Sequence, residues 1–405
     1  MNEILSGVRV LEVASWTFVP AAGAILADWG ADVIKIEHPV SGDPQRGLVS
    51  SGLVPGAVGG FNYMMEQPNR GKRSVGLNLS SDEGRDLLYR LAESSDVFLT
   101  NFLPAARTRL QIDVEHIRAH NPAIVYVRGT GQGTRGPDAA KGGYDGASYW
   151  ARGGIANALT PRGVEPPIGQ RPALGDVMGG LAIAGGIAAA LLRRERTGTP
   201  SVVDVSLLAT ALWNIAPDVV ASKLYEGVEM PTFDADAPPN PLVGLYRTGD
   251  GRYLSLVMLE SDRFWPDLCR HLGRPELIDD PRYSNAAARF EHRRECRQQL
   301  VEIFATAPLD EWRTRLATLE GVWAPVQTAR ELHDDVQVVA NGYLPTVSAD
   351  DGTPVELVAN PVQFDETPAV LRRAPDHGQH TEEVLLELGL SWDELIVHKE
   401  SGAIL

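Results

Sequence analysis

The sequence predicts an α/β protein, with a large doubly wound domain built on a mostly parallel sheet and a smaller α+β domain. The apolar run VRVLEVA (8–14) precedes a segment of helical period and a second apolar run, DVIKIEHP (32–39), which is the order of a βαβ unit. The order recurs at SVGLNL (74–79) and DVFLTNF (96–102), with a serine-capped helix at 80–95 between them. Short buried strands that alternate with helices are typical of a parallel sheet covered on both faces.

Later segments continue this order. A helix at 113–120 precedes the β-rich run AIVYVRGTG (123–131), and an apolar helix around 176–196 precedes a strand and a further helix within 197–213. Ligands of such sheets bind outside the carboxyl ends of the strands. We therefore expect binding residues directly after the strands.

The pattern changes near residue 225. The segment YRTGDGRYLSLVM (246–258) has a Gly-Asp-Gly turn between two strand-like runs, and amphipathic helices follow it. We expect a large domain at 1–215, a small α+β domain at 225–330, and a C-terminal segment at 340–405 that returns to the large domain.

Composition excludes several classes of protein. A net charge of −16 disfavours a nucleic-acid partner, because phosphate binding needs a basic face. Cys269 and Cys296 are too few for a disulfide framework, which fits a reducing compartment. The most apolar stretch is interrupted at Gly185 and Gly186, and no signal-peptide pattern opens the sequence. We expect a cytoplasmic protein with no membrane or nucleic-acid partner.

Familiar catalytic motifs are missing. Glu37 ends the second strand, where dinucleotide enzymes hold a ribose, but the preceding turn SWTFVPAAG (15–23) lacks the G-x-G-x-x-G spacing that admits a pyrophosphate. The nine histidines show no metal-ligand clustering, so we expect no metal site. No G-x-S-x-G motif is present to anchor a hydrolase triad.

One carboxylate lies near the start of an apolar, glycine-rich helix. This is Asp176, in RPALGDVMGGLAIAGGIAAALL (171–192). A short acidic side chain at this position can cap the free N–H groups of the first helical turn. A functional role is the alternative, and the helix by itself does not decide between the two.

The sequence resembles the family III CoA-transferases, also called the CaiB/BaiF family, which include formyl-CoA transferase and the α-methylacyl-CoA racemases. The motifs that carry the resemblance appear in family order: LSGVRVLEVA (5–14), WGADVIKIEHPVSGDPQRG (29–47), NRGKRSVGLNL (69–79), DVFLTNFLPAARTRL (96–110), AIVYVRGTGQGTRGP (123–137), GGYDGAS (142–148), LGDVMGG (174–180) and RRERTGTPSVVDVSLLATAL (193–212). The resemblance implies a Rossmann-like large domain and becomes diffuse after residue 225.

The resemblance implies that Asp176 is the catalytic nucleophile. In the implied reaction its carboxylate attacks an acyl-CoA thioester, and aspartyl anhydride and aspartyl-CoA thioester intermediates carry CoA to an acceptor carboxylate. Gly175, Gly179 and Gly180 would keep bulk away from the carboxylate and offer N–H groups to an oxyanion, whereas Gly185 and Gly186 would serve close helix packing.

The resemblance also implies a CoA site, with CoA and acyl-CoA as substrates and no tightly bound cofactor. Lys72, Arg73 and Arg109 would lie near the CoA phosphates, and His38 near the nucleotide. Each of these cations has an alternative interpretation as an ordinary surface residue. The remaining expected binding residues are Thr17, Phe18, Asn69, Asn101, Phe102, Tyr144 and Asp145.

Two activities and a binding role stay open. Racemases of this family pair a histidine in a G-H-D segment with the shared aspartate, but here the segment reads Gly143-Tyr144-Asp145. Tyrosine, with an ordinary pKa of about 10, is a poor base at neutral pH, which favours a transferase over a racemase. An inactive CoA-binding homologue is disfavoured by the intact Asp176. The resemblance further implies an interlocked homodimer, with acyl-CoA and a carboxylic acid as the small-molecule partners.

Overall fold

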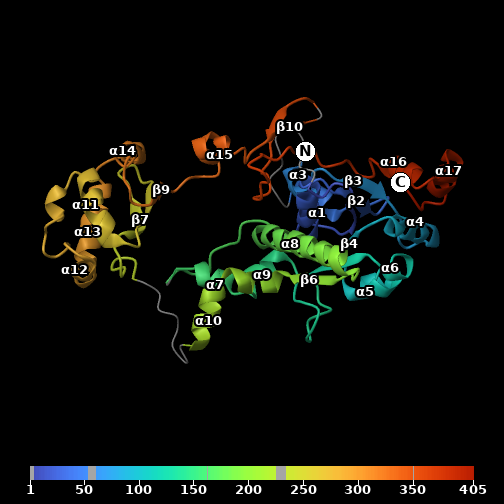
Figure 1. Cartoon of the computed structure of the whole chain (residues 1–405), viewed down its shortest axis with the longest axis horizontal. Coiled ribbons are helices and arrows are strands. Elements are labelled where there is room, and N and C mark those ends of the chain that lie inside the picture. The colour runs from blue at the N-terminus through green and yellow to red at the C-terminus, as the bar shows by residue number, and fades with distance from the viewer. Residues whose placement is uncertain (1–3, 53–60, 162, 225–233, 350) are drawn as a thin grey trace. The chain divides into compact units, whose positions relative to one another are not determined.

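The chain divides into two compact units, which are described separately. The computed structural model describes residues 4–52, 61–161, 163–224, 234–349 and 351–405 (Figure 1). Residues 1–226 and 336–405 form the large unit, and residues 227–335 form the small unit. The bounds expected from the sequence were 1–215 and 340–405 for the large domain and 225–330 for the small one.

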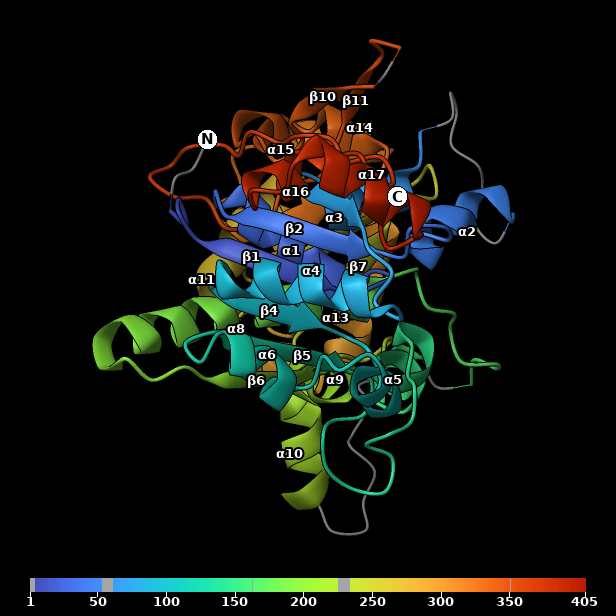
Figure 2. The same ribbon diagram turned by 90° about the vertical axis from the view of Figure 1, so that its right-hand side faces the viewer.

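A six-stranded parallel sheet organises the large unit (Figure 2). Its strands stand in the order β3-β2-β1-β4-β5-β6, which is the Rossmann order with a switch point between β1 and β4. The prediction of a doubly wound α/β fold is confirmed. The strand bounds are β1 (Arg9–Val13), β2 (Asp32–Glu37), β3 (Arg73–Gly76), β4 (Val97–Thr100), β5 (Val125–Thr130) and β6 (Val202–Ser206).

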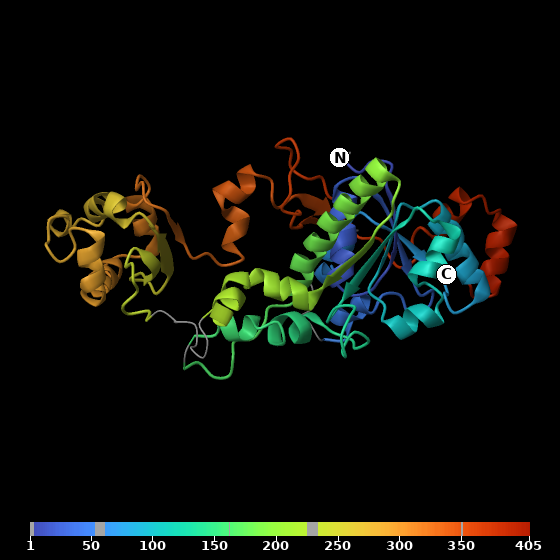
Figure 3. The ribbon, with the colours of Figure 1, turned by 60° about the horizontal axis from the view of Figure 1, so that its bottom comes forward.

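Helices cover both faces of this sheet (Figure 3). Successive residues of a strand point to opposite faces, so Val10 packs with α1 (Phe18–Asp28) and α8 (Leu174–Thr197) on one side. Leu11 packs on the other side with α4 (Asp82–Glu93), α6 (Val114–His120), α16 (Thr381–Glu387) and α17 (Trp392–Glu400). Both faces are therefore apolar, as the continuous apolar runs of the strands predict.

The other helices of the large unit are short and lie mainly in the connections. They are α2 (Gly47–Ser50), α3 (Tyr63–Asn69), α5 (Pro104–Arg109), α7 (Ile155–Leu159), α9 (Leu207–Asn214), α10 (Ala216–Leu224) and α15 (Val336–Ala340), with a π-helical turn at Gly146–Ala151 and a 3₁₀ turn at Pro44–Arg46. A two-stranded antiparallel sheet joins β10 (Thr346–Ser348) to β11 (Pro354–Glu356).

The small unit combines an antiparallel sheet with helices around its own apolar core. β7 (Val243–Arg247) and β8 (Tyr253–Val257) form the expected hairpin, and β9 (Trp323–Pro325) pairs with β8. Amphipathic helices follow the hairpin as expected, and two of them are divided at His292, whose backbone leaves the helical region. The helices are α11 (Ser261–His271), α12 (Ala286–Glu291), α13 (Arg293–Phe304) and α14 (Leu309–Arg315), with 3₁₀ turns at Pro275–Leu277 and Glu331–Asp334.

Helices α1 and α8 of the large unit pack closely against each other. A Cβ atom at Gly179 would lie 2.3 Å from Cε2 of Phe18, and one at Gly180 would lie 2.7 Å from Cβ of Ala21.

By length and composition α8 is also the one helix in the described part of the chain that could cross a membrane. Core helices of soluble proteins pass the same test, and Ile183 of α8 is buried in the core.

The structure corrects the roles expected for these glycines. Only the first four N–H groups of a helix lack an intrahelical acceptor, and α8 starts at Leu174. Gly179 and Gly180 lie beyond that turn, so their N–H groups are used within the helix and do not form an oxyanion site. Their role is close packing against α1. The packing role expected for Gly185 is wrong, because a Cβ atom there would meet nothing within 4 Å.

Two alanine substitutions on α8 should therefore have opposite effects on the free energy of unfolding. Gly179→Ala should lower it by about 1–3 kcal/mol, because the new methyl group forces Phe18 to move. Gly185→Ala, the matched control, should leave it unchanged or raise it by up to about 1 kcal/mol, since alanine favours the helix and has room. Urea unfolding measures both. Equal changes at the two positions would contradict the packing assignment.

Candidate active site

A cavity of about 400 Å³ opens at the carboxyl ends of three neighbouring strands. Ser15 and Trp16 follow β1, Asn101 and Phe102 follow β4, and Gly131 follows β5. The cavity therefore lies at the switch point between β1 and β4, where doubly wound sheets bind their ligands. Asp176, from the first turn of α8, also lines it.

Asp176 contributes an unpaired carboxylate to this cavity. It is only partly exposed, and its carboxylate has no hydrogen bond or ion pair to any residue that the structure describes. Burial raises the pKa of Asp176 to about 7, and the negative charge of Asp145 adds to the rise. A carboxylate with few hydrogen bonds is a stronger nucleophile than a solvated one, so the site holds a group suited to attack a carbonyl carbon.

The helix-capping role belongs to Asp145 and not to Asp176. The N–H of Gly175 donates to both carboxylate oxygens of Asp145, at 3.1 and 3.2 Å. Ala173 occupies the N-cap position in the left-handed region, with φ of 61°, and has no side-chain acceptor to offer. The capping interpretation of Asp176 is therefore wrong. Asp145 is buried beneath the turn, so its expected contact with CoA is replaced by a structural contact that holds Asp176 in place.

Aromatic side chains form one wall of the cavity. The rings of Trp16 and Tyr144 meet edge to face, with centroids 5.7 Å apart and an angle of 88° between planes. Tyr144 lines the cavity and is 65% exposed. Phe18 and Phe102 line the same space, in agreement with their expected position.

Two exposed cations, Arg109 and Lys141, line the cavity. Arg109, which was expected near the CoA phosphates, ends α5 and is exposed. Lys141 was not predicted from the sequence. It lies three residues before Tyr144 and contacts Asp138 at 2.7 Å, with 72% of its side chain exposed. The sequence feature that could have indicated it is its position directly before the GGYDGAS motif (142–148).

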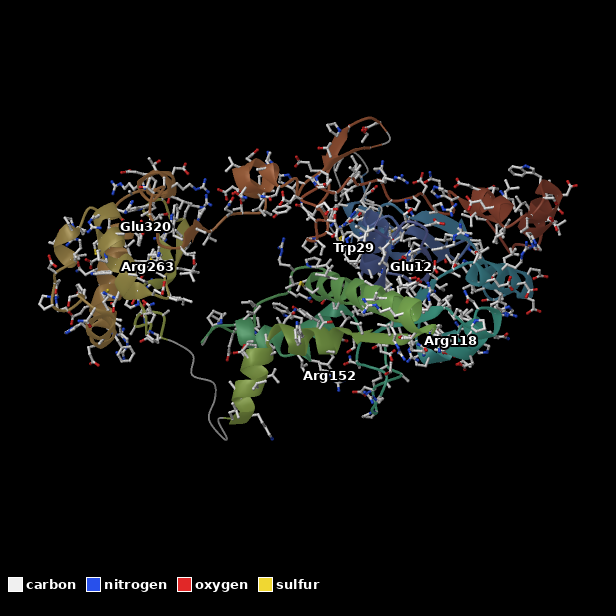
Figure 4. The ribbon with its side chains drawn as sticks, viewed as in Figure 1. Glu12, Trp29, Arg118, Arg152, Arg263 and Glu320 are labelled. Carbon is white, nitrogen blue, oxygen red and sulfur yellow. The ribbon has the colours of Figure 1, made fainter. Side chains whose placement is uncertain are left out.

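Several expected binding residues do not reach the cavity. Lys72 is fully buried, with Nζ 2.8 Å from both carboxylate oxygens of Glu12 and 3.0 Å from Oδ1 of Asn69, which is buried too (Glu12 is labelled in Figure 4). Arg73 is the first residue of β3, at the amino edge of the sheet, and binds Asp32 and Glu387. The expected phosphate contacts of Lys72 and Arg73 are thus replaced by ion pairs within the protein.

Two further expected residues also lie elsewhere. The exposed ring of His38 accepts hydrogen bonds from the N–H groups of Val40 and Ser41, so it closes the turn after β2. Thr17 faces a second cavity of about 650 Å³ on another side of α1, together with Val177. Among the described residues, one group could offer three metal ligands, namely Asp113, Glu115 and His116, but Arg107 and Thr108 already bind Asp113.

Substitution of Asp176 should change how stability depends on pH. Its pKa is higher in the folded protein, about 7, than the ordinary value of 3.8, so its contribution to folding is complete below about pH 4 and is lost as pH rises through 7. Asp176→Asn should therefore stabilise the protein at pH 8, on the order of 2 kcal/mol relative to the wild type, and much less at pH 5.

Urea unfolding at the two pH values measures this difference. Asp138→Asn is the control, because Lys141 and Arg152 lower the pKa of that partly exposed carboxyl. An advantage of Asp176→Asn that is the same at pH 5 and pH 8 would contradict the raised pKa.

Comparisons with known proteins show which family the chain resembles. The family model for CoA-transferase family III matches residues 5–381. The chain is 32% identical to a (R)-2-hydroxy-4-methylpentanoate CoA-transferase of Clostridioides difficile, over 99% of both chains, and 32% identical to a cinnamoyl-CoA:phenyllactate CoA-transferase of Clostridium sporogenes, over 97% of this chain and 95% of the relative.

Solved structures show the same relationship. The crystal structure of a CaiB/BaiF family protein from Brucella suis is 29% identical and superimposes with a TM-score of 0.80, covering 96% of this chain and all (100%) of that one. Extended likeness in sequence and structure, with a cavity at the expected strand ends, identifies the family. The chain belongs to family III of the CoA-transferases and is a CoA-transferase.

Proposed function

We propose that the enzyme moves CoA between carboxylic acids through covalent intermediates on Asp176. The observation that carries the proposal is the unpaired, partly buried carboxylate of Asp176 at the cavity between β1 and β4. Named relatives transfer CoA between carboxylates, including a succinate–glutarate CoA-transferase of Agrobacterium fabrum at 32% identity. The position of Asp176 gives this chain the nucleophile that such a reaction needs.

The reaction starts when a carboxylate oxygen of Asp176 attacks the thioester carbonyl of the donor acyl-CoA. The C–S bond breaks, which leaves a mixed anhydride and the CoA thiolate. The thiolate attacks the aspartyl carbonyl, the donor acid leaves as a carboxylate, and an aspartyl-CoA thioester remains. The acceptor carboxylate attacks this thioester and expels the thiolate, giving a second anhydride. The thiolate then attacks the acceptor's acyl carbon, forming the product acyl-CoA and freeing Asp176.

Neighbouring groups support this sequence. The ionised form of Asp176 is required for attack, and its pKa near 7 leaves it substantially ionised at neutral pH yet poorly solvated. Arg109 and Lys141 supply positive charge for the CoA phosphates. Tyr144 stands where a racemase would place a histidine, so the site lacks the second neutral-pH base that removal of an α-proton would use.

Trapping of the covalent intermediate tests the proposal. Hydroxylamine added during turnover of an acyl-CoA and an acid should convert Asp176 to a hydroxamate, which mass spectrometry locates in its peptide. Asp176→Asn should lower transfer by at least about a thousandfold, because the amide cannot attack. Asp145→Asn is the matched control and should retain the adduct, since the nucleophile is intact.

The proposal fails if CoA is transferred while no modified Asp176 peptide appears. Exchange of the α-proton for deuterium without an acceptor acid would favour the racemase instead. Binding of CoA with neither reaction would indicate an inactive homologue.

We also propose a homodimer, interlocked as the family resemblance implies, in the cytoplasm. Helices α9 and α10 expose large apolar side chains, with Trp213 81%, Val220 60% and Leu224 75% exposed, and such surfaces favour association. Light scattering should give twice the mass of the 43.8 kDa chain, and a monomer at micromolar concentration would contradict the dimer. Both cysteines are free and buried, which is compatible with a reducing compartment.

A further inference from the structure

The turn between β1 and α1 has a backbone conformation that its sequence disfavours. Trp16 lies in the left-handed region, with φ of 69°, where a bulky residue without glycine's freedom is strained. Such a conformation persists only when surrounding contacts hold it. The contacts that hold Trp16 therefore decide where its indole ring lies.

Two neighbouring loops clamp this turn from opposite sides. After β4, the side chain of Asn101 accepts from the N–H of Ser15 at 3.1 Å and donates to its carbonyl at 2.6 Å. After β2, the carboxylate of Asp43 accepts from the N–H of Trp16 at 3.1 Å. Gln45 adds a hydrogen bond from Nε2 to Oγ1 of Thr17 at 3.0 Å.

Asp43 is itself held by buried contacts. Its side chain is buried, and its Oδ2 lies 2.8 Å from Nζ of Lys35 on β2, which is buried as well. Its Oδ1 also accepts from the N–H of Gln45 at 2.9 Å. The acceptor that holds Trp16 is thus a buried carboxylate in an ion pair with Lys35, which leaves it little freedom to move.

The indole held in this way stands at the reacting centre. Trp16 meets Tyr144 edge to face, Tyr144 is followed by Asp145, and Asp145 binds the turn that carries Asp176. Trp16, Tyr144 and Asp176 line one cavity. In the proposed reaction Asp176 touches the thioester carbonyl, so the attached acyl group lies in the cavity that this aromatic wall lines.

We propose that Asp43 is a positioning residue which holds Trp16 so that the Trp16–Tyr144 wall selects acyl groups with an apolar, aryl or branched side chain. This inference rests on the proposed function, since it assumes acyl transfer at Asp176. An aromatic wall favours an acyl group that buries apolar surface against it, and gives no such advantage to an acetyl group.

A double-mutant cycle on substrate selectivity tests the proposal. Selectivity is the ratio of kcat/KM for 3-phenylpropanoyl-CoA to that for acetyl-CoA, with one acceptor acid. Trp16→Ala and Asp43→Ala should each lower this ratio by roughly tenfold, because the first removes the indole ring and the second removes the acceptor that holds it in position. In the Trp16→Ala background, Asp43→Ala should lower it no further, because Asp43 acts through Trp16. General destabilisation would lower both kcat/KM values equally and leave the ratio unchanged.

Asp43→Asn is the matched variant if Asp43→Ala does not fold. It keeps an Oδ1 acceptor for the N–H groups of Trp16 and Gln45 but loses the charge facing Lys35, so selectivity should fall by only about two- to threefold, again only when Trp16 is present. Unchanged selectivity in the Asp43 variants, or equal losses with and without Trp16, would overturn the inference while the hydroxamate at Asp176 still upholds the proposed function. A wild-type chain that transfers no CoA would overturn both.

Discussion

A cluster of four buried charges is the interaction on which the rest of the large unit depends. Glu12 on β1 lies 2.8 Å from Nζ of Lys72 and 3.3 Å from Nζ of Lys35, and Lys35 lies 2.8 Å from Asp43. Two carboxylates and two ammonium groups cancel in charge, which is what makes their burial tolerable. Burial opposes the charge on Lys35, but Asp43 and Glu12 outweigh it and raise its pKa.

This cluster connects parts of the chain that lie far apart in sequence. It joins β1, β2, the loop after β2 and the segment before β3, and Lys72 also donates to the carbonyl of Pro20 in α1 at 2.9 Å. Burial lowers the pKa of Lys72 to about 8, although Glu12 opposes the change. Gly23 of α1 is required here, because a Cβ atom would lie 2.0 Å from Oε2 of Glu12. Removal of one partner would leave a buried charge uncompensated, which is far more destabilising than loss of a surface pair.

The sequence was sufficient to predict the architecture and the residues that follow the strands, but it predicted only Arg109 of the two exposed cations at the cavity and placed Lys72 and Arg73 there wrongly. Alternating apolar runs reveal strands because both faces of a parallel sheet are buried, and residues directly after strands, such as Asn101 and Phe102, meet at one edge by geometry alone. A lysine, in contrast, does not reveal its partner. Glu12 lies 60 residues before Lys72, and Glu387 lies 314 residues after Arg73, so the ion pairs that withdraw both cations from the cavity depend on tertiary structure.

The same limit explains why Trp16 and Asp43 were missed as a pair. The sequence shows an aromatic residue after the first strand and an acidic residue after the second. The left-handed backbone of Trp16 and the hydrogen bond from its N–H to Asp43 can be seen only in the folded chain. Strain at such a position can persist because the structure around it is rigid, and here the rigidity comes from the buried charges below Asp43. The charges that stabilise the sheet thus also shape the wall beside Asp176, which joins the stability of the fold to the selectivity of the site.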